Sequence, residues 1–360
     1  MLSLAPTHSL VSTRPPEVQH FSPGRTSFLP APTVRLSAHT GEVLTVAFSP
    51  DGRVLSSAGT DKDILLWDVY ATGSGSGTSS VLKGHGAAVL RCSWYGDKDQ
   101  TPMTSSPGGP SGYCDGSLLS CSADKTLAVW DGHTGKRVRK FIRHEAIVND
   151  CCAGRDLAVS GSDDSKVILW DQRVKKANVA EYECDYQVLS VAMSSDGSRV
   201  FAGTLDNFIF SFDTRKFGDA RMTDEEAEQF DEPAVLGEVG DSVTGVSYYD
   251  DMVFSNAMDN SACLWDARSF SNRRLISGFS GPHSHGIEKL LLRSAISPIF
   301  LACGSSDGVL NVWSRKSREI YCRLPGHEAS LNDVSFSPTD RFVVATASSD
   351  KTVLLGELPV

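Results

Sequence analysis

A short motif that ends in an aromatic residue and an acid recurs along the sequence, and it constrains the fold more than any other feature. The copies read DILLWD, TLAVWD, VILWD, FIFSFD, ACLWD, LNVWS and TVLLGE, and their aromatic position holds Trp67, Trp130, Trp170, Phe212, Trp265, Trp313 and Gly356. Successive copies are 63, 40, 42, 53, 48 and 43 residues apart. The chain is therefore built from seven units of 40 to 43 residues, some of them lengthened by insertions.

An aspartate stands six residues before each of these positions, which makes it the most regular mark in the chain. The seven are Asp61, Asp124, Asp164, Asp206, Asp259, Asp307 and Asp350. Further upstream stand His39, His85, His144, His285 and His327, and the 22 residues from His39 to Asp61 equal those from His285 to Asp307. A period near 40 with a Gly-His-like start and a Trp-Asp end is the signature of a blade of four antiparallel strands.

The local composition of each unit also indicates strands. In GEVLTVAFSPDGRVLSSAGTDKDILLWD, runs of β-branched and apolar residues are separated by SPDG and GTDKD, which have turn chemistry. The chain has 360 residues, 40% of them apolar, and closed all-β folds of that size form one domain. The sequence therefore predicts an all-β fold with one large core.

These marks resemble the WD40 family from Pro32 to Leu358, and the resemblance implies a seven-bladed WD40 β-propeller. In that family a His, a strand Ser or Thr, the turn Asp and the Trp form a buried hydrogen-bonded network. Three units hold the full set: His39, Ser57, Asp61 and Trp67; His85, Ser120, Asp124 and Trp130; His144, Ser160, Asp164 and Trp170. The resemblance extends this structural network to Asp206, Asp259, Trp265, His285, Asp307, Trp313, His327 and Asp350, although Cys184, Val239, Cys303 and Gly356 replace network residues.

The seventh unit ends after its third strand, so the segment Thr33 to Ser37 is expected to supply the fourth and close the ring. Residues 1–31 contain prolines, serines and isolated apolar positions, which indicates a disordered tail before a propeller over 32–360. The insertions are 71–79, 96–115 and 217–233, and the WD40 topology places all three on the same face.

The motifs that could indicate a catalytic, nucleotide-binding or metal-binding site are explained by the repeats or lack essential residues. GSGSG at 73–77 lacks the central serine of a nucleophile elbow, and GHTGK at 132–136 lacks phosphate-loop spacing. His283 and His285 lack a third ligand nearby in sequence, and the nine cysteines include no CxxC. We therefore expect no enzyme activity, cofactor, metal or small-molecule substrate, and the absence of a long apolar run predicts no membrane span.

Two surfaces are candidates for partner binding. Although the net charge is -10, 17 of the 34 Lys and Arg residues lie in five segments after the Trp-Asp positions, on the face of the insertions. This basic rim, with the candidates Lys136, Arg137, Lys175, Lys176, Arg273, Arg274, Arg315 and Lys316, would meet RNA backbone or an acidic protein. It is equally consistent with solvated outer strands. On the other face, Thr60, Asp163, Met258 and Ser306 would line a central opening in which a peptide could dock.

Some stretches resemble one WD40 group more closely. DKDILLWDVY, DYQVLSV, DSVTGVS, SNAMDN, EKLLLR and LPGHEASLNDVSFSP look like the WD40 subunits of the spliceosomal U5 small nuclear ribonucleoprotein (U5 snRNP). The resemblance implies a non-catalytic nuclear scaffold in pre-mRNA splicing, bound to the large central U5 protein and other spliceosome subunits. The alternative is a peptide-reading WD40 adaptor of a chromatin or ubiquitin-ligase complex.

Overall fold

The regular secondary structure in the described residues consists of strands. The computed structural model describes residues 27, 29–71, 78–96, 116–174, 177–215, 234–268, 275–280, 283–287 and 290–359. Within them, 28 strands form seven sheets of four antiparallel strands each. No helix in these residues is long and apolar enough to cross a membrane.

Each sheet is one blade, and its strands follow one another from the inside of the ring to the outside. Blade 1 contains β2 (Val43–Phe48), β3 (Val54–Gly59), β4 (Ile64–Asp68) and β5 (Thr78–Leu82). Blade 2 contains β6 (Val89–Trp94), β7 (Ser117–Ser122), β8 (Thr126–Asp131) and β9 (Arg137–Ile142). Blade 3 contains β10 (Val148–Ala153), β11 (Leu157–Ser162), β12 (Lys166–Asp171) and β13 (Asn178–Glu183). Blade 4 contains β14 (Val188–Met193), β15 (Arg199–Thr204), β16 (Phe208–Asp213) and β17 (Ala234–Glu238).

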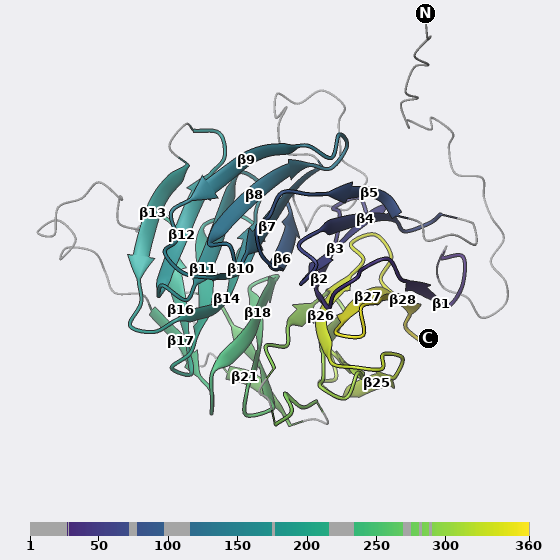
Figure 1. Cartoon of the computed structure of the whole chain (residues 1–360). Helices are drawn as coiled ribbons and strands as arrows, with labels where there is room; N and C mark the ends of the chain where they lie inside the picture. Colours follow the sequence, from purple (N-terminus) through teal and green to yellow (C-terminus); the bar gives the residue numbers. More distant parts are fainter. Residues whose placement is uncertain are drawn as a thin grey trace, which may run out of the picture.

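The remaining blades complete the ring. Blade 5 contains β18 (Val243–Tyr249), β19 (Met252–Ala257), β20 (Ser261–Asp266) and β21 (Leu275–Ser280). Blade 6 contains β22 (Ser294–Ile296), β23 (Phe300–Cys303), β24 (Leu310–Ser314) and β25 (Ile320–Leu324). Blade 7 contains β26 (Leu331–Phe336), β27 (Val343–Ser348) and β28 (Val353–Glu357), with β1 (Thr33–Leu36) as its outer strand. The inner strands β2, β6, β10, β14, β18, β22 and β26 contact one another in a closed circle (Figure 1).

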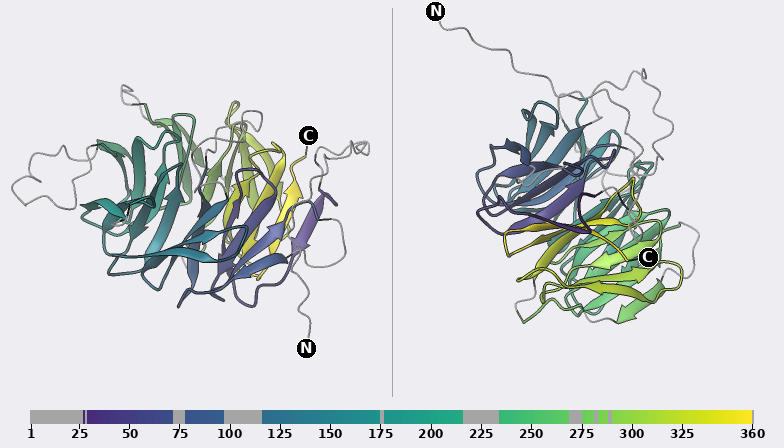
Figure 2. Two further views of the ribbon diagram at one scale, coloured as in Figure 1. Left: turned by 90° about the horizontal axis from the view of Figure 1, so that it is seen from above. Right: turned by 90° about the vertical axis from the view of Figure 1, so that its right-hand side faces the viewer.

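The ring closes where the two ends of the fold meet. Strand β1 pairs antiparallel with β28, with Thr33 opposite Gly356 and Leu36 opposite Val353. Two residues upstream of β1 also join this blade, since Leu29 is buried in its core and the Ser27 hydroxyl donates a hydrogen bond to the Glu357 carboxylate. The predicted closure is confirmed, and the two strands lie side by side at the edge of the ring (Figures 1 and 2).

The hydrophobic core lies between the blades. Seven clusters of buried apolar residues occur in the described part of the chain, one for each pair of neighbouring blades. Trp130, for example, packs with residues of blade 1, and Trp170 with residues of blade 2. Burial of one such side chain contributes about 2 to 3 kcal/mol. Each blade is therefore held by its neighbours on both sides.

The two ends of the ring carry different connections. The inner strands begin at one end, called here the start face, where the turns between second and third strands also lie. They finish at the other, the end face, where the first strand connects to the second and the third to the fourth. The insertions begin after β4, β6 and β16, so all three leave from the end face, as predicted. Most of their residues lie outside the described part of the chain.

Candidate functional site

The predicted network residues lie inside the blades, and blade 3 shows their geometry. His144 Nδ1 is 2.8 Å from the Asp164 carboxylate, and His144 Nε2 is 2.7 Å from Ser160 Oγ. Trp170 Nε1 donates to the same hydroxyl at 2.8 Å. The same three contacts join His39, Asp61, Ser57 and Trp67 in blade 1 and His85, Asp124, Ser120 and Trp130 in blade 2.

Hydrogen bonds hold the carboxylates of Asp124, Asp164 and Asp350 in the ionised form. Burial by itself would raise the pKa of Asp164, but hydrogen bonds from His144 and from the backbone N–H groups of Glu145 and Lys166 outweigh it and lower the pKa to about 2. Asp124 and Asp350 have pKa values lowered to about 2 by equivalent bonds. Each aspartate thus fixes a turn and a histidine inside one blade, which is a structural role.

Other blades keep only parts of this network. In blade 7, His327 contacts Asp350 at 2.9 Å and Thr346 at 2.8 Å, with Gly356 at the tryptophan position. In blade 5, Trp265 donates to Ser255 at 2.8 Å, and Asp259 accepts the N–H groups of Gly240 and Ser261. In blade 4, Asp206 accepts a hydrogen bond from Thr204, and Phe212 packs edge-on against Tyr182.

The predicted pairing of His285 with Asp307 in blade 6 is wrong. His285 Nε2 lies 3.0 Å from Thr244 Oγ1 of blade 5, whereas Asp307 accepts the N–H of Val309 and lies 3.7 Å from Arg323. The reason is a longer loop: β22 begins nine residues after His285, whereas β2 begins four residues after His39. His283 instead packs edge-on against Trp313, with ring centroids 5.7 Å apart.

His283 and His285 do not form part of a metal cluster. Among the residues that the structure describes, no group of three or more His, Cys, Asp or Glu side chains could hold a metal ion. The eight described cysteines are free thiols, and burial raises the pKa of Cys303 to about 12.

A group of buried charges near the axis of the ring was missed by the sequence analysis. Arg293 of blade 6 reaches Asp150 of blade 3 at 3.0 Å, and Arg91 of blade 2 reaches Asp333 of blade 7 at 2.5 Å. Arg91 also lies 3.4 Å from Asp150. We call these four residues the Arg-Asp cross, since two of their contacts, Arg293 with Asp150 and Arg91 with Asp333, join blades that are not neighbours.

Asp150 and Asp333 also tie adjacent blades together. Asp150 accepts hydrogen bonds from the hydroxyl of Ser190 and the N–H of Val191 in blade 4. Asp333 accepts the corresponding pair from Thr45 and Val46 in blade 1, across the junction where the ring closes. The buried charges are therefore both paired and hydrogen-bonded, which offsets their desolvation.

The sequence contained a signal for this cross. Thr45, Arg91, Asp150 and Asp333 each stand six residues after a network histidine. That position is the third residue of the inner strand, and the pairing register shifts immediately before it in each of these blades. Such a bulge re-aims a side chain. A comparison of inner strands across the repeats would have found opposite charges at equivalent positions.

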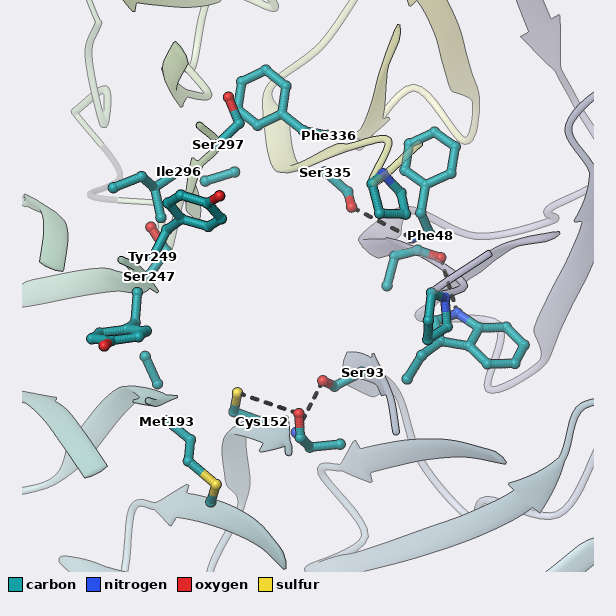
Figure 3. Close-up of a pocket in the computed structure, with 18 of the residues that line it drawn as sticks. Phe48, Ser93, Cys152, Met193, Ser247, Tyr249, Ile296, Ser297, Ser335 and Phe336 are labelled. Carbon is teal, nitrogen blue, oxygen red and sulfur yellow. Dashed lines mark hydrogen bonds between the residues drawn. The ribbon is translucent and has the colours of Figure 1, made fainter. Parts of the chain in front are cut away.

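A cavity of about 480 Å³ occupies the axis of the ring on the end face. Phe48, Met193, Tyr249, Ile296 and Phe336 contribute apolar surface to its wall, with serine hydroxyls between them (Figure 3). Among the described residues that line it, Arg91 and Arg341 are the charged ones. Since Arg91 belongs to the Arg-Asp cross, the cross lies at the inner end of this cavity.

The basic rim is largely neutralised where the structure describes it. Arg173, Arg215 and Arg268 each bond the aspartate two positions earlier, and Arg315 bonds Asp250 at 2.9 Å. The candidates Lys136, Arg137 and Lys316 are exposed, and no described carboxylate forms an ion pair with them. The candidates Lys175, Lys176, Arg273 and Arg274 lie outside the described residues.

Three of the four candidates of the start face, Thr60, Asp163 and Met258, lie next to the beginnings of inner strands. The N–H groups of Thr60, Asp163, Met258 and Ser306 donate to the carbonyls of Glu42, Ile147, Ser242 and Ser284. Glu42, Ile147 and Ser242 each directly precede an inner strand. The candidates therefore surround the axis, and the Arg-Asp cross lies further along it.

Comparisons with known proteins agree with this geometry. The model of the WD domain, G-beta repeat, matches residues 31–68, 76–131, 135–171 and 318–355. The U5 small nuclear ribonucleoprotein 40 kDa protein of Homo sapiens is 38% identical over 93% of this chain and 86% of its own length. The protein of that name in Dictyostelium discoideum is 32% identical over the same shares. Pre-mRNA-splicing factor cwf17 of Schizosaccharomyces pombe is 33% identical over 93% of this chain and 90% of its own length. The chain is therefore a WD40-repeat protein that belongs to the family of the U5 small nuclear ribonucleoprotein 40 kDa protein.

Proposed function

We propose that this chain is a non-catalytic scaffold subunit of the U5 snRNP that acts in pre-mRNA splicing in the nucleus. The observation that carries the proposal is the similarity, over 93% of the chain, to proteins named for the U5 snRNP and for pre-mRNA splicing. The architecture supports it, because a rigid ring with two faces can hold several proteins in a fixed relation. The large central U5 protein and its neighbours are the proposed partners.

The described histidines and aspartates support a scaffold more than an enzyme. Those that resemble catalytic groups are buried in repeated networks within the blades. Their recurrence from blade to blade is expected of groups that hold a fold.

A direct contact with RNA is a secondary part of the proposal. It depends on exposed cations such as Lys136 and Lys316, because several arginines of the basic rim are engaged by carboxylates. We therefore assign RNA at most a peripheral contact on the end face, with proteins as the principal partners.

The function is tested by purification of the full-length tagged chain from nuclear extract of its own organism. We expect U5 RNA and the core U5 proteins to co-purify and to remain bound in about 150 mM salt, where the Debye length is roughly 8 Å and long-range attraction between charges is screened. A matched purification of the triple variant Lys136→Glu, Arg137→Glu and Lys316→Glu measures the contribution of the rim. Absence of U5 RNA and U5 proteins from the unmutated chain would refute the assignment.

A further inference from the structure

An exposed apolar strip lies on the start face in blades 3, 4 and 5. It consists of Ile147, Tyr186, Leu205 and Met258, called here the apolar arc. Ile147, Tyr186 and Leu205 are 37%, 50% and 40% exposed, and Met258 is partly exposed. Exposed apolar residues that gather in one place indicate a surface that binds something.

Hydrogen bonds show that the residues of the arc are neighbours. The N–H of Asp163 donates to the carbonyl of Ile147, and the Asn149 amide bridges Asp163 to the Val188 carbonyl in blade 4. The N–H of Leu205 donates to the carbonyl of Gln187, which follows Tyr186. Hydrogen bonds therefore link the loop that carries Ile147 in blade 3 to the loops that carry Tyr186 and Leu205 in blade 4.

The same kind of link continues into blade 5. The Ser242 hydroxyl donates to the carbonyl of Leu205 at 2.9 Å. The N–H of Met258 donates to the carbonyl of Ser242 at 3.0 Å. The arc thus follows one side of the axis across three blades.

The repeat supplies an internal comparison for these positions. Where blades 4 and 5 have Leu205 and Met258 before the turn aspartate, blades 1, 2 and 7 have Thr60, Ala123 and Ser349. Small or polar residues therefore satisfy the fold at this position. The large apolar side chains of Leu205 and Met258 are therefore not required by the propeller, which indicates a role in binding.

Carboxylates surround the arc and determine the charge of its partner. Glu145, Asp163, Asp185, Asp206, Asp241 and Asp259 lie on the same six loops, 143–147, 163–166, 184–187, 205–207, 239–242 and 258–260. The Lys and Arg residues of these loops are Arg143 and Lys166, and Arg143 is engaged by Glu181 at 2.7 Å. Asp185 is exposed and accepts no hydrogen bond from a described residue.

We propose that the apolar arc and its surrounding carboxylates bind a protein segment in which Lys or Arg residues alternate with apolar side chains. The apolar side chains would cover Tyr186 and Leu205, and the cations would meet Asp185 and its neighbours. The negative surface disfavours RNA, whose backbone it would repel. This surface lies on the face of the ring opposite to the basic rim, and the proposal holds whether or not the chain acts in splicing.

The test starts with selection of a random 12-residue peptide library on the purified full-length chain. We expect the selected peptides to be rich in Lys, Arg and apolar residues. Fluorescence anisotropy of one labelled peptide then measures affinity for the unmutated chain and for the double variant Tyr186→Ser, Leu205→Ser. Loss of the two apolar contacts should weaken binding about tenfold or more.

Matched variants separate this surface from general effects. Val138→Ser with Ile142→Ser removes two side chains of β9 that are 63% and 74% exposed, and it should leave the affinity unchanged. Asp185→Lys should weaken binding about fivefold or more, whereas Glu319→Lys on the end face should not. Thermal unfolding of every variant reports whether the fold is intact.

Four results would overturn the proposal. The first is that the selection enriches no peptide, and the second is that the selected peptides are acidic. The third is that the peptide binds the unmutated chain and the double variant with equal affinity. The fourth is that single-stranded RNA or a second copy of the chain binds the apolar arc more tightly than the peptide does. The last is measured by competition with a poly-uridine oligomer and by sedimentation of the chain alone. Retention of U5 proteins by a variant that fails in the peptide assay separates this proposal from the splicing assignment.

Discussion

His144 and His285 follow similar sequence signals but have opposite surroundings. His144 lies between the Asp164 carboxylate and the Ser160 hydroxyl. His285 is fully buried, and among the described residues its ring nitrogens bond Thr244 and the Asn256 amide and no carboxylate. Burial, together with the neighbouring His283, lowers the pKa of His285 to about 4. The histidine of blade 6 is therefore neutral wherever the chain is folded above that pH.

This difference predicts a pH dependence of stability. When the pH falls below about 6.5, His285 becomes protonated in the unfolded chain, but in the folded chain it stays neutral until about pH 4. The free energy of unfolding therefore keeps the full contribution of this residue above about pH 6.5 and loses it as the pH falls from about 6.5 to about 4. The loss from this residue reaches about 3 kcal/mol. In His285→Gln, the free energy of unfolding should fall less between pH 7 and pH 4, measured by urea denaturation. The exposed His133→Gln is the control, and parallel pH profiles for His285→Gln and the unmutated chain would contradict the expectation.

The turn between the second and third strands of each blade was well predicted from sequence. The residue after each turn aspartate has a positive φ: Lys62, Lys125, Ser165, Asn207, Asn260, Gly308 and Lys351. Only one of the seven is glycine, so composition did not reveal the left-handed backbone. The aspartate side chain explains it, because in blades 2, 3, 5, 6 and 7 its carboxylate accepts the N–H two positions later and fixes the turn.

Blade 6 shows where reasoning from the repeat fails. The distance between two repeat residues reveals the length of an insertion between them. That distance stays the same, however, when one segment between the two residues is longer and another is shorter by the same number of residues. The 22 residues from His285 to Asp307 hide a longer loop and an inner strand, β22, of only three residues. The pairing of β1 with β28 was predictable because the seventh repeat visibly lacks one strand.

Strand β1 is expected to be essential to the fold, whereas most of the segment before it is not. A chain that starts at residue 41 lacks β1, exposes the edge of β28, and should lose cooperative unfolding or melt about 10 °C lower. A chain that starts at residue 32 keeps β1 but loses buried Leu29, so its melting temperature should lie between those of the chain that starts at residue 41 and the full chain. A chain that starts at residue 26 is the control. Equal melting temperatures by circular dichroism for the starts at 26 and 41 would disprove the role of β1.

At the level of the whole molecule, the Arg-Asp cross acts as a brace across the ring. Arg293 donates to Asp150 and to the carbonyls of Asn149 and Leu189, which lie on the opposite side of the axis. Sequence reasoning within single repeats could not find contacts between blades 3 and 6. It placed the two faces well, because they follow from strand order alone, whereas the expected insertion 71–79 overlaps β5, which begins at Thr78.

Removal of this brace should destabilise the ring strongly. Arg293→Met leaves the buried Asp150 carboxylate with one cation fewer and should cost about 3 to 5 kcal/mol in the free energy of unfolding. Arg293→Met combined with Asp150→Asn removes the uncompensated charge and should recover part of the loss. Arg341→Met, at an exposed arginine, is the control in urea denaturation. A cost below about 1 kcal/mol for Arg293→Met would show that the brace is not needed.

The pairing of β1 with β28 also sets the order of events during synthesis. Strand β1 leaves the ribosome before the other described strands of the ring, and its partner β28 is the last of them to emerge. Earlier blades can form as they emerge, yet the nascent protein keeps an open arc with two unsealed sheet edges until the last strand arrives. Translation that stops before β28 therefore yields an incomplete ring that is prone to aggregate, and the emergence of β28 is the step that seals the ring.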